Sequence, residues 1–201
     1  MISSIYIFKI LLSYLGVEYE INQLSEINQE FTNKLESYNQ FIKHTQKDED
    51  YLLGQSAVIS RYISNNHNFS GKSLQESARV DDIVESVLEI IEEYILPIIN
   101  SNIISDEITK LLCTHFNDFE NQLSKSTFSA GGDSTTLADL YLFILYDITL
   151  RYLENNGYMA HHFNEKYPHL ERLKLHFLSN KSVSEFINSN SINSQTSQLI
   201  I

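Results

Sequence analysis

TTLADLYLFILYDITLRYLE, residues 135–154, is the stretch that decides the fold of this chain. It is apolar enough to be the central helix of a helical domain. Its start, Thr136-Leu137-Ala138-Asp139, predicts a capping box in which Thr136 caps the helix and Asp139 reaches back toward it. This pair should serve folding rather than chemistry, and the loss of either partner should cost about 1 kcal/mol.

Most of the chain after residue 73 has helical periodicity. In SARVDDIVESVLEIIEEYILPII, residues 77–99, apolar side chains recur at helical spacing and acidic side chains largely occupy the remaining faces. Pro97 should kink or end this helix. Further helices are predicted for 104–124, 169–178 and 183–188, and 191–201 is expected to be a mobile tail.

The first third of the chain mixes helix and strand patterns. Helices are predicted for 7–15, ended by Gly16, and for 56–64, with a weaker one at 26–37. Strands are predicted for 17–21, 40–44 and 50–54. Because 65–73 is rich in Asn, Ser and Gly, it is the best linker candidate. We therefore expect a small α/β domain over residues 1–66 and an all-helical domain over 74–190, with the tail 191–201 after it.

Composition narrows the class of protein. The chain has 201 residues, of which 42% are hydrophobic, so it can bury a core. A net charge of −12 argues against nucleic acid or an anionic membrane as a partner. No apolar run is long enough to span a bilayer. The one cysteine, Cys113, excludes an intramolecular disulfide and suggests a reducing compartment, so a cytoplasmic location is expected.

The sequence contains no recognised motif for metal or nucleotide binding. The seven histidines are scattered, and the adjacent pair His161-His162 would not share a helix face. No CxxC, HExxH or ExxH pattern supplies metal ligands, so no metal site is expected. No GxGxxG or GxxxxGK[ST] pattern is present either, so nucleotide binding has no motif.

Four segments together resemble the cytosolic glutathione transferases of the Tyr/Ser type. LLSYLGVEYE, 11–20, is similar to the end of their first helix and their second strand, and GQSAVISRYI, 54–63, to the segment that grips the γ-glutamyl end of glutathione. SARVDDIVESVLEI, 77–90, is similar to the opening helix of their second domain. STTLADLYLF, 134–143, followed by FNEKYPHLERL, resembles the capped helix of that domain and its downstream loop. The implied fold is an α/β thioredoxin-like domain followed by an all-α bundle.

The resemblance implies a site at the mouth of the helix after Gly54. A helix N-terminus offers free N–H groups and partial positive charge, so it favours a carboxylate. Ser56 would add a hydroxyl and Gln55 an amide contact to the γ-glutamyl group, while Glu89 from the partner subunit of a homodimer would balance its ammonium. Two plainer interpretations stay open, in which Gln55-Ser56 is only a helix cap and Glu89 only a solvated charge. Glutathione would be a co-substrate, a small hydrophobic electrophile the other partner, and no further cofactor is implied.

The chain also departs from the family pattern at its start. Relatives carry a first strand and a loop that aims a Tyr or Ser hydroxyl at the glutathione sulfur, which favours the nucleophilic thiolate. Only MISSIYIF precedes the matching segment, so that strand and loop are missing from the expected domain. Tyr6 falls inside the first helix, and Ser3 or Ser4 could reach the sulfur only in a rearranged chain start. The catalytic residue is therefore not assigned.

A second departure concerns the cis-proline that relatives keep before their third strand. Asn39 or Gln40 stands there, and a trans turn is expected because a non-proline cis bond costs about 2.5–4 kcal/mol. Either the amino-terminal domain is rearranged or the chain is an incomplete version of a longer gene product. Three hypotheses follow: a dimeric glutathione transferase, a catalytically inactive binding or scaffold protein of the same fold, and an acidic helical interaction domain.

Overall fold

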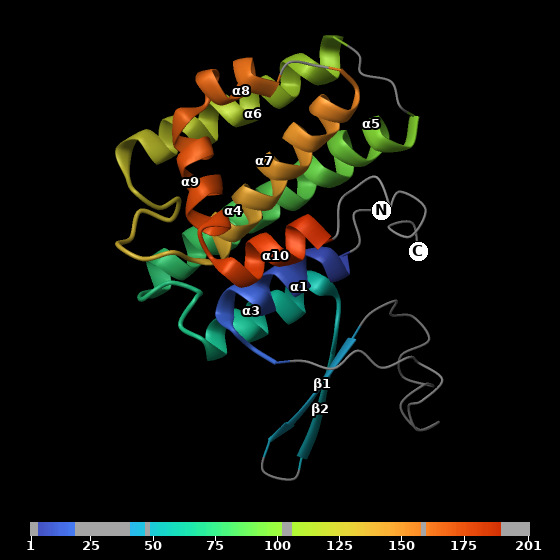
Figure 1. Cartoon of the computed structure of the whole chain (residues 1–201). Coiled ribbons are helices and arrows are strands. Elements are labelled where there is room, and N and C mark those ends of the chain that lie inside the picture. Colours follow the sequence, from blue (N-terminus) through green and yellow to red (C-terminus); the bar gives the residue numbers. More distant parts are fainter. Residues whose placement is uncertain (1–3, 19–40, 47–48, 102–105, 158–159, 190–201) are drawn as a thin grey trace.

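The computed structural model describes residues 4–18, 41–46, 49–101, 106–157 and 160–189 (Figure 1). The first part of the chain consists of α1 (Ser4–Leu15), β1 (Phe41–Gln46), β2 (Glu49–Gly54) and α3 (Ser56–Asn66). The second part consists of α4 (Leu74–Ile90), the π-helical turn η2 (Ile91–Ile95), α5 (Leu96–Ser101), α6 (Asp106–Lys125), α7 (Leu137–Asn155), α8 (Ala160–Lys166), α9 (Pro168–Leu178) and α10 (Lys181–Ser189).

Helix α7 lies at the centre of the bundle, as its sequence predicts (Figure 1). Every residue from Leu137 to Leu150 is buried. Helices α4 and α9 make the main contacts along it, and α1, α3 and α8 also touch it. A helix that is apolar on all sides needs neighbours on all sides. The second part of the chain therefore assembles around α7.

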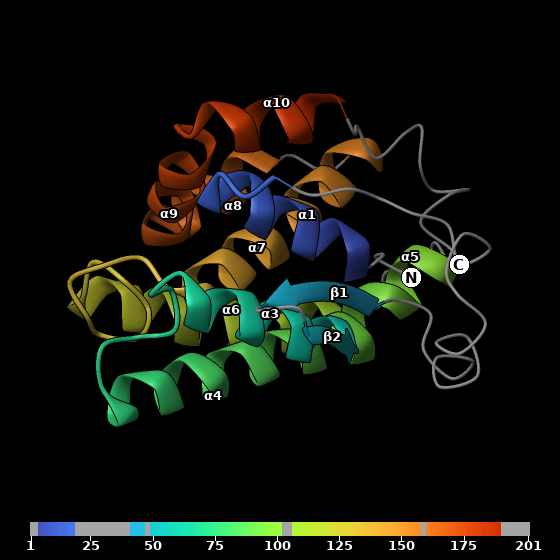
Figure 2. The same ribbon diagram turned by 90° about the horizontal axis from the view of Figure 1, so that it is seen from below.

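Helix α1 connects the first part of the chain to the bundle. It packs against α3, α7 and α10, and Figure 2 shows it between α10 and α3. Its apolar residues, among them Ile10 and Leu11, are buried. The helix ends at Gly16, whose φ of 66° lies in the left-handed region that favours glycine. The predicted helix over 7–15 is thus confirmed and begins three residues earlier, at Ser4.

The strands β1 and β2 form an antiparallel hairpin. Phe41 lies opposite Gly54, and Gln46 opposite Glu49, which confirms the two strands predicted around 40–44 and 50–54. Val17 and Glu18, the first two residues of the strand predicted for 17–21, are not in a strand. The rest of that strand, the helix predicted for 26–37, the turn at 39–40 and the tail lie outside the described residues.

The connection between α3 and α4, predicted as a linker, is packed against the bundle. Phe69 is 5% exposed, and its ring lies 5.3 Å from that of Tyr14 on α1. The Phe69 carbonyl oxygen accepts a hydrogen bond of 2.8 Å from the backbone N–H of Leu137, the first residue of α7. The connection therefore fixes α3 relative to the central helix.

The long helix after this connection continues through Pro97 instead of ending there. Proline has no N–H, so the ordinary α-helical bond to the carbonyl four residues earlier cannot form. The turn before it widens to a π-helix over Ile91–Ile95, in which the Leu96 N–H bonds the Ile91 carbonyl, and α5 then runs on to Ser101. Widening is a common way to accommodate such a break. Pro97 was predicted to kink or end this helix; the helix is locally widened before Pro97 but does not end there.

The region before α9 contains a helix, α8, that was not predicted from the sequence. Phe163 of α8 packs into an aromatic cluster, with ring centroids 5.2 Å from Phe116, 5.8 Å from Tyr146 and 4.6 Å from Tyr167. Its stability comes from this tertiary packing rather than from a helix signature. Among the described residues, no helix is both long and apolar enough to cross a bilayer.

Candidate functional site

The site predicted at the mouth of α3 is built on an unusual backbone conformation. Gln55 precedes the helix with φ 65° and ψ 122°, which few residues other than glycine adopt. Its side chain is exposed and makes no capping hydrogen bond, while its carbonyl oxygen accepts from the Ile59 N–H at 2.9 Å. Conformations of this kind cost on the order of 1–3 kcal/mol and cluster at ligand sites.

The first turn of α3 has N–H groups without a side-chain acceptor. Ser56, Ala57 and Val58 supply these donors, and among the described residues no side chain bonds to them. Helix α3 also carries no acidic residue in its first turn to offset its dipole. Such a turn offers hydrogen-bond donors and partial positive charge, so it can bind a carboxylate or another small anion.

At the starts of α4 and α9, by contrast, side chains accept hydrogen bonds from the first N–H groups. Ser73 Oγ accepts the Glu76 N–H at 3.1 Å at the start of α4. Glu120 of α6 accepts the His169 and Leu170 N–H groups at the start of α9, at 2.9 and 3.0 Å. At α3, Gln55 has the positive φ described above, and its exposed side chain makes no capping hydrogen bond. Within the described part of the chain, no side chain therefore caps the mouth of α3.

Helix α3 is held firmly behind its first turn. Ile59 and Ile63 are buried, and the Tyr141 hydroxyl of α7 donates to the Ser60 hydroxyl at 3.3 Å. Arg61 donates to Asp81 of α4 at 2.7 Å and also contacts Glu85. A ligand at the helix mouth would therefore meet donors whose positions are set by the bundle.

Glu89 lies on the exposed side of α4, one turn beyond Glu85. The described contacts do not bring it to Ser56 within this chain. The prediction for Glu89 concerns the partner subunit of a dimer, so it stays a prediction. Gln55 and Ser56 are brought together at the mouth of α3, as expected from their adjacency.

Tyr6 is buried in the core. It is 7% exposed, and its ring packs 5.6 Å from that of Phe186 on α10. Burial raises the pKa of the Tyr6 phenol far above its ordinary value, and the nearby Asp147 carboxylate raises it further. Tyr6 is therefore a core residue, and the sulfur-activating group stays unassigned.

Thr136 and Asp139 form the capping box at the start of α7, and Asp139 also holds a distant turn. Its Oδ2 accepts from the Thr136 N–H at 2.8 Å and from the Thr136 hydroxyl at 2.9 Å. Its Oδ1 accepts from the Ser129 N–H at 2.7 Å. Burial raises the pKa of Asp139, while the bonds from Ser129 and Thr136 oppose that rise.

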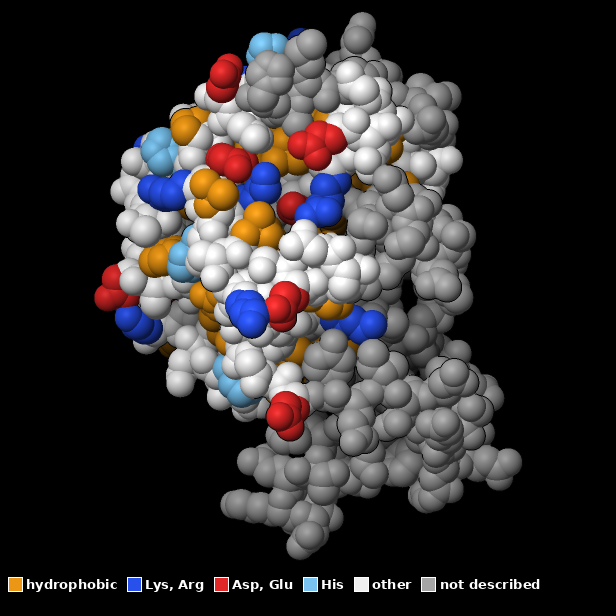
Figure 3. Space-filling model, viewed as in Figure 1, with side chains coloured by type: hydrophobic (Ala, Val, Ile, Leu, Met, Phe, Trp, Pro, Cys, Tyr) orange, Lys and Arg blue, Asp and Glu red, His pale blue; other side chains and the backbone are white. Residues whose placement is uncertain are grey.

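The charge distribution indicates neither a metal centre nor a basic binding face in the described parts. Among these residues, no three His, Cys, Asp or Glu side chains gather as metal ligands. On the described portion of the face in Figure 3, basic and acidic side chains are interspersed rather than gathered by sign. Contacts such as that of Arg61 with Asp81 join residues 20 positions apart, and no sequence pattern marks them.

Comparisons with known proteins indicate the family to which the chain is related. Residues 101–190 match the family model described as glutathione S-transferase, C-terminal domain. A glutathione S-transferase domain-containing protein of Dictyostelium discoideum is 96% identical over 201 residues, with 100% of both chains covered. A second protein of that organism, named as a glutathione S-transferase alpha-2, is 37% identical over 179 residues, with 89% of this chain and 85% of that protein covered.

The fold is also that of a solved structure. The crystal structure of the glutathione S-transferase from Ascaris lumbricoides superposes with a TM-score of 0.66 at 20% identity, covering 94% of this chain and 93% of that chain. This confirms the predicted fold class, a thioredoxin-like domain followed by a helical domain.

Proposed function

Because this chain belongs to the glutathione S-transferase family, we propose that the mouth of α3 binds glutathione and that the bound thiol attacks a small electrophile. The observation that carries this proposal is the first turn of α3, whose N–H groups have no side-chain acceptor among the described residues. The γ-glutamyl carboxylate of glutathione has the charge and size that such a helix mouth favours.

Each proposed contact follows from a chemical group of the ligand. The Ser56 hydroxyl and the N–H groups beside it donate to the γ-glutamyl carboxylate, and the Gln55 amide adds a contact from the exposed side. The partner subunit's Glu89 balances the γ-glutamyl ammonium in a homodimer. The rigid attachment of α3 to α4 and α7 means that little ordering of these groups is needed on binding.

The proposed reaction is nucleophilic transfer by sulfur. The glutathione thiolate forms a C–S bond with an electrophilic carbon, and the leaving group departs with the electron pair of the broken bond. A thiol with a pKa of about 8.5 is mostly protonated at neutral pH, so the reaction needs a donor or positive charge close to the sulfur. We expect no cofactor besides glutathione as co-substrate.

A second candidate is a binding or scaffold protein of the same family that does not turn over substrate. It is favoured by the burial of Tyr6, whose ring packs against that of Phe186 on α10. Glutathione would then bind without reacting. Binding and turnover measured on the same protein separate the two candidates.

The experiment is calorimetric titration of glutathione into the full chain and into Ser56→Ala. A hydrogen bond to a charged group contributes about 1.5–3 kcal/mol, so Ser56→Ala should weaken affinity roughly tenfold or more. Ser73→Ala is the matched control, because it removes a serine from another helix start and should leave affinity unchanged.

Turnover of an aromatic halide, followed by absorbance, completes the experiment. Binding with turnover supports the transferase, and binding without turnover supports the binding protein. Absence of glutathione binding by the wild-type chain, or an equal affinity of Ser56→Ala, would overturn the proposed site.

The same proposal includes the organisation of the molecule. We place the glutathione-binding domain at residues 1–66, the helical domain at 74–190 and a tail at 191–201, and propose a cytoplasmic homodimer. Sedimentation equilibrium of the full chain tests the dimer, since a monomer at all concentrations would contradict the role given to the partner subunit's Glu89.

A further inference from the structure

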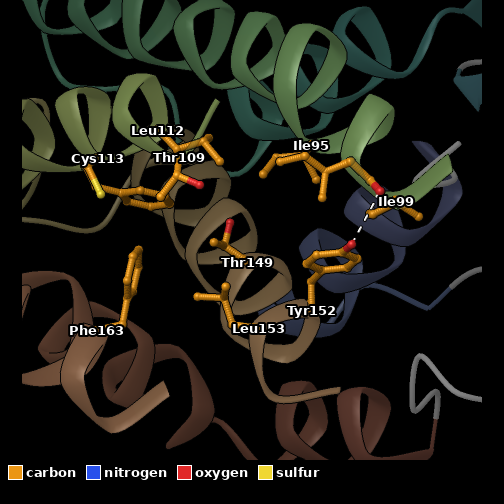
Figure 4. A pocket seen from close by; sticks show the side chains of 11 residues that line it. Ile95, Ile99, Thr109, Leu112, Cys113, Thr149, Tyr152, Leu153 and Phe163 are labelled. Atoms are coloured by element: carbon orange, nitrogen blue, oxygen red, sulfur yellow. Dashed lines mark hydrogen bonds between the residues drawn. The ribbon is translucent and has the colours of Figure 1, made fainter. Parts of the chain in front are cut away.

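A cavity lies inside the helical part of the chain, and no residue of α3 lines it. It has a volume of about 60 Å³, is partly open to solvent and is lined by side chains from Ile95 and α5, α6, α7 and α8. Figure 4 shows Thr149 of α7 in the middle, with Cys113 and Phe163 on one side and Ile95 and Tyr152 on the other. The cavity is therefore separate from the proposed glutathione site.

Short side chains leave this space open. Protein cores are close-packed, and large apolar residues normally fill the region where helices meet. Here α6 contributes Thr109 and Cys113, and α7 contributes Thr149, at positions that line the same space. The π-helical turn η2 ends at Ile95, on the opposite wall. The gap thus lies where a widened helix faces short residues on two neighbours.

The polar groups on the wall are already engaged. The Thr149 hydroxyl donates to the Leu145 carbonyl at 2.8 Å, and the Tyr152 hydroxyl donates to the Ile98 carbonyl at 3.4 Å (Figure 4). A buried water needs about two to four polar partners, so this wall is a poor site for water. Apart from the exposed Thr109, aliphatic, aromatic and thiol side chains form the remainder of the lining.

We propose that this cavity is a binding site for a small, uncharged, apolar molecule. Its size sets the class of ligand. An apolar cavity of about 150 Å³ is known to stay dry and to bind benzene or xenon. The cavity here is smaller, so it suits xenon or a short aliphatic molecule rather than an aromatic ring. Glutathione, which is charged and larger, is excluded from it.

Cys113 gives a specific readout, because it lines the cavity and is the one cysteine of the chain. The test measures the rate of Cys113 alkylation by iodoacetamide in the full chain, with xenon at increasing pressure. If xenon occupies the site, the rate should fall as 1 + [xenon]/Kd, or about tenfold when xenon exceeds Kd about ninefold. The xenon-129 resonance should show a saturable bound-state shift over the same range.

Thr149→Ile fills the cavity from its centre and should abolish both effects. Thr114→Ile is the matched control, because Thr114 is an exposed threonine of α6 whose hydroxyl also donates to the carbonyl four residues earlier, at 3.0 Å. It should retain the wild-type response. Circular dichroism shows that each variant folds, and if Thr149→Ile does not, the wild-type measurements decide alone.

Two results would overturn the proposal. One is a wild-type alkylation rate and xenon resonance that do not respond to xenon pressure. The other is an undiminished response in folded Thr149→Ile. Neither result depends on glutathione, so this site and the proposed function can fail separately.

Discussion

Replacement of Asp139 by alanine should destabilise the fold much more than loss of a helix cap alone. Asp139 is fully buried, and its two oxygens accept bonds from the N–H groups of Ser129 and Thr136 and from the Thr136 hydroxyl. The carboxylate therefore joins the start of α7 to the turn before it. Asp139→Ala removes the acceptor of two buried backbone donors at once.

The magnitude follows from those donors. A buried N–H without an acceptor costs about 1–3 kcal/mol, so two of them cost roughly 2–6 kcal/mol. Removal of the buried carboxylate offsets part of this loss of stability, because burial disfavours the ionised form of Asp139. We expect a net loss of about 3 kcal/mol for Asp139→Ala. Thr136→Ala removes only the hydroxyl cap and should cost about 1 kcal/mol.

Urea denaturation followed by circular dichroism measures both losses as shifts of the unfolding midpoint. Asp118→Ala is the control, because Asp118 is an exposed aspartate of α6 and its loss should change stability by less than about 0.5 kcal/mol. If Asp139→Ala costs no more than Thr136→Ala, the bond to Ser129 contributes nothing and the reasoning is wrong.

Three further predictions concern packing, capping and pH. In Gly132→Ala the new Cβ would clash with Oε1 of Glu76, so displacement of that carboxylate should cost about 1 kcal/mol by urea denaturation, and nothing in a Glu76→Ala background. Glu120→Ala leaves the first N–H groups of α9 without their acceptor and should cost about 2 kcal/mol, whereas a loss below about 0.5 kcal/mol would exclude this role. Burial raises the pKa of Asp147 despite its bond to Arg151, so the folded state binds a proton more readily than the unfolded state. The unfolding free energy should therefore fall as pH rises from the ordinary value of 3.8 through the folded-state pKa, and urea titrations of Asp147→Asn should lack this component.

Helices with their own periodicity could be predicted from the sequence, because spacing and side-chain type act within a few turns. This holds for α1, α3, α7, α9 and α10. Helix α8 could not, since AHHFNEK carries little apolar pattern and depends on the packing of Phe163 against three distant rings. The π-helical turn before Pro97 could not be predicted from the sequence either. Proline predicts a lost bond, but not how the neighbouring turns compensate.

At the candidate site and the start of α7, too, local features could be predicted from the sequence, whereas tertiary contacts could not. Thr136 and Asp139 could be recognised as a local pair, but the bond of Asp139 to Ser129 depends on how a ten-residue segment returns to α7. Glu120 is further away still, since it caps a helix that begins 48 positions later in the chain. Neither contact has a sequence signature, because the partners meet only after the bundle has assembled.

The mouth of α3 also differs from other helix starts in a way that the sequence does not indicate. A polar residue precedes each of α3, α4 and α7, so from residue type alone each would be interpreted as a helix cap. Ser73 and Thr136 have extended backbones, and the cap regions that they begin are closed by local hydrogen bonds. Gln55 has φ 65° instead and makes no capping hydrogen bond, and the donors of α3 have no side-chain acceptor among the described residues. The proposed binding site thus differs from the other two helix starts in one backbone dihedral, at the turn from β2 into a helix that Arg61 and Ser60 hold in place. A replacement that restored an ordinary capping conformation at position 55 would therefore stabilise α3 and compete with any anion at its mouth.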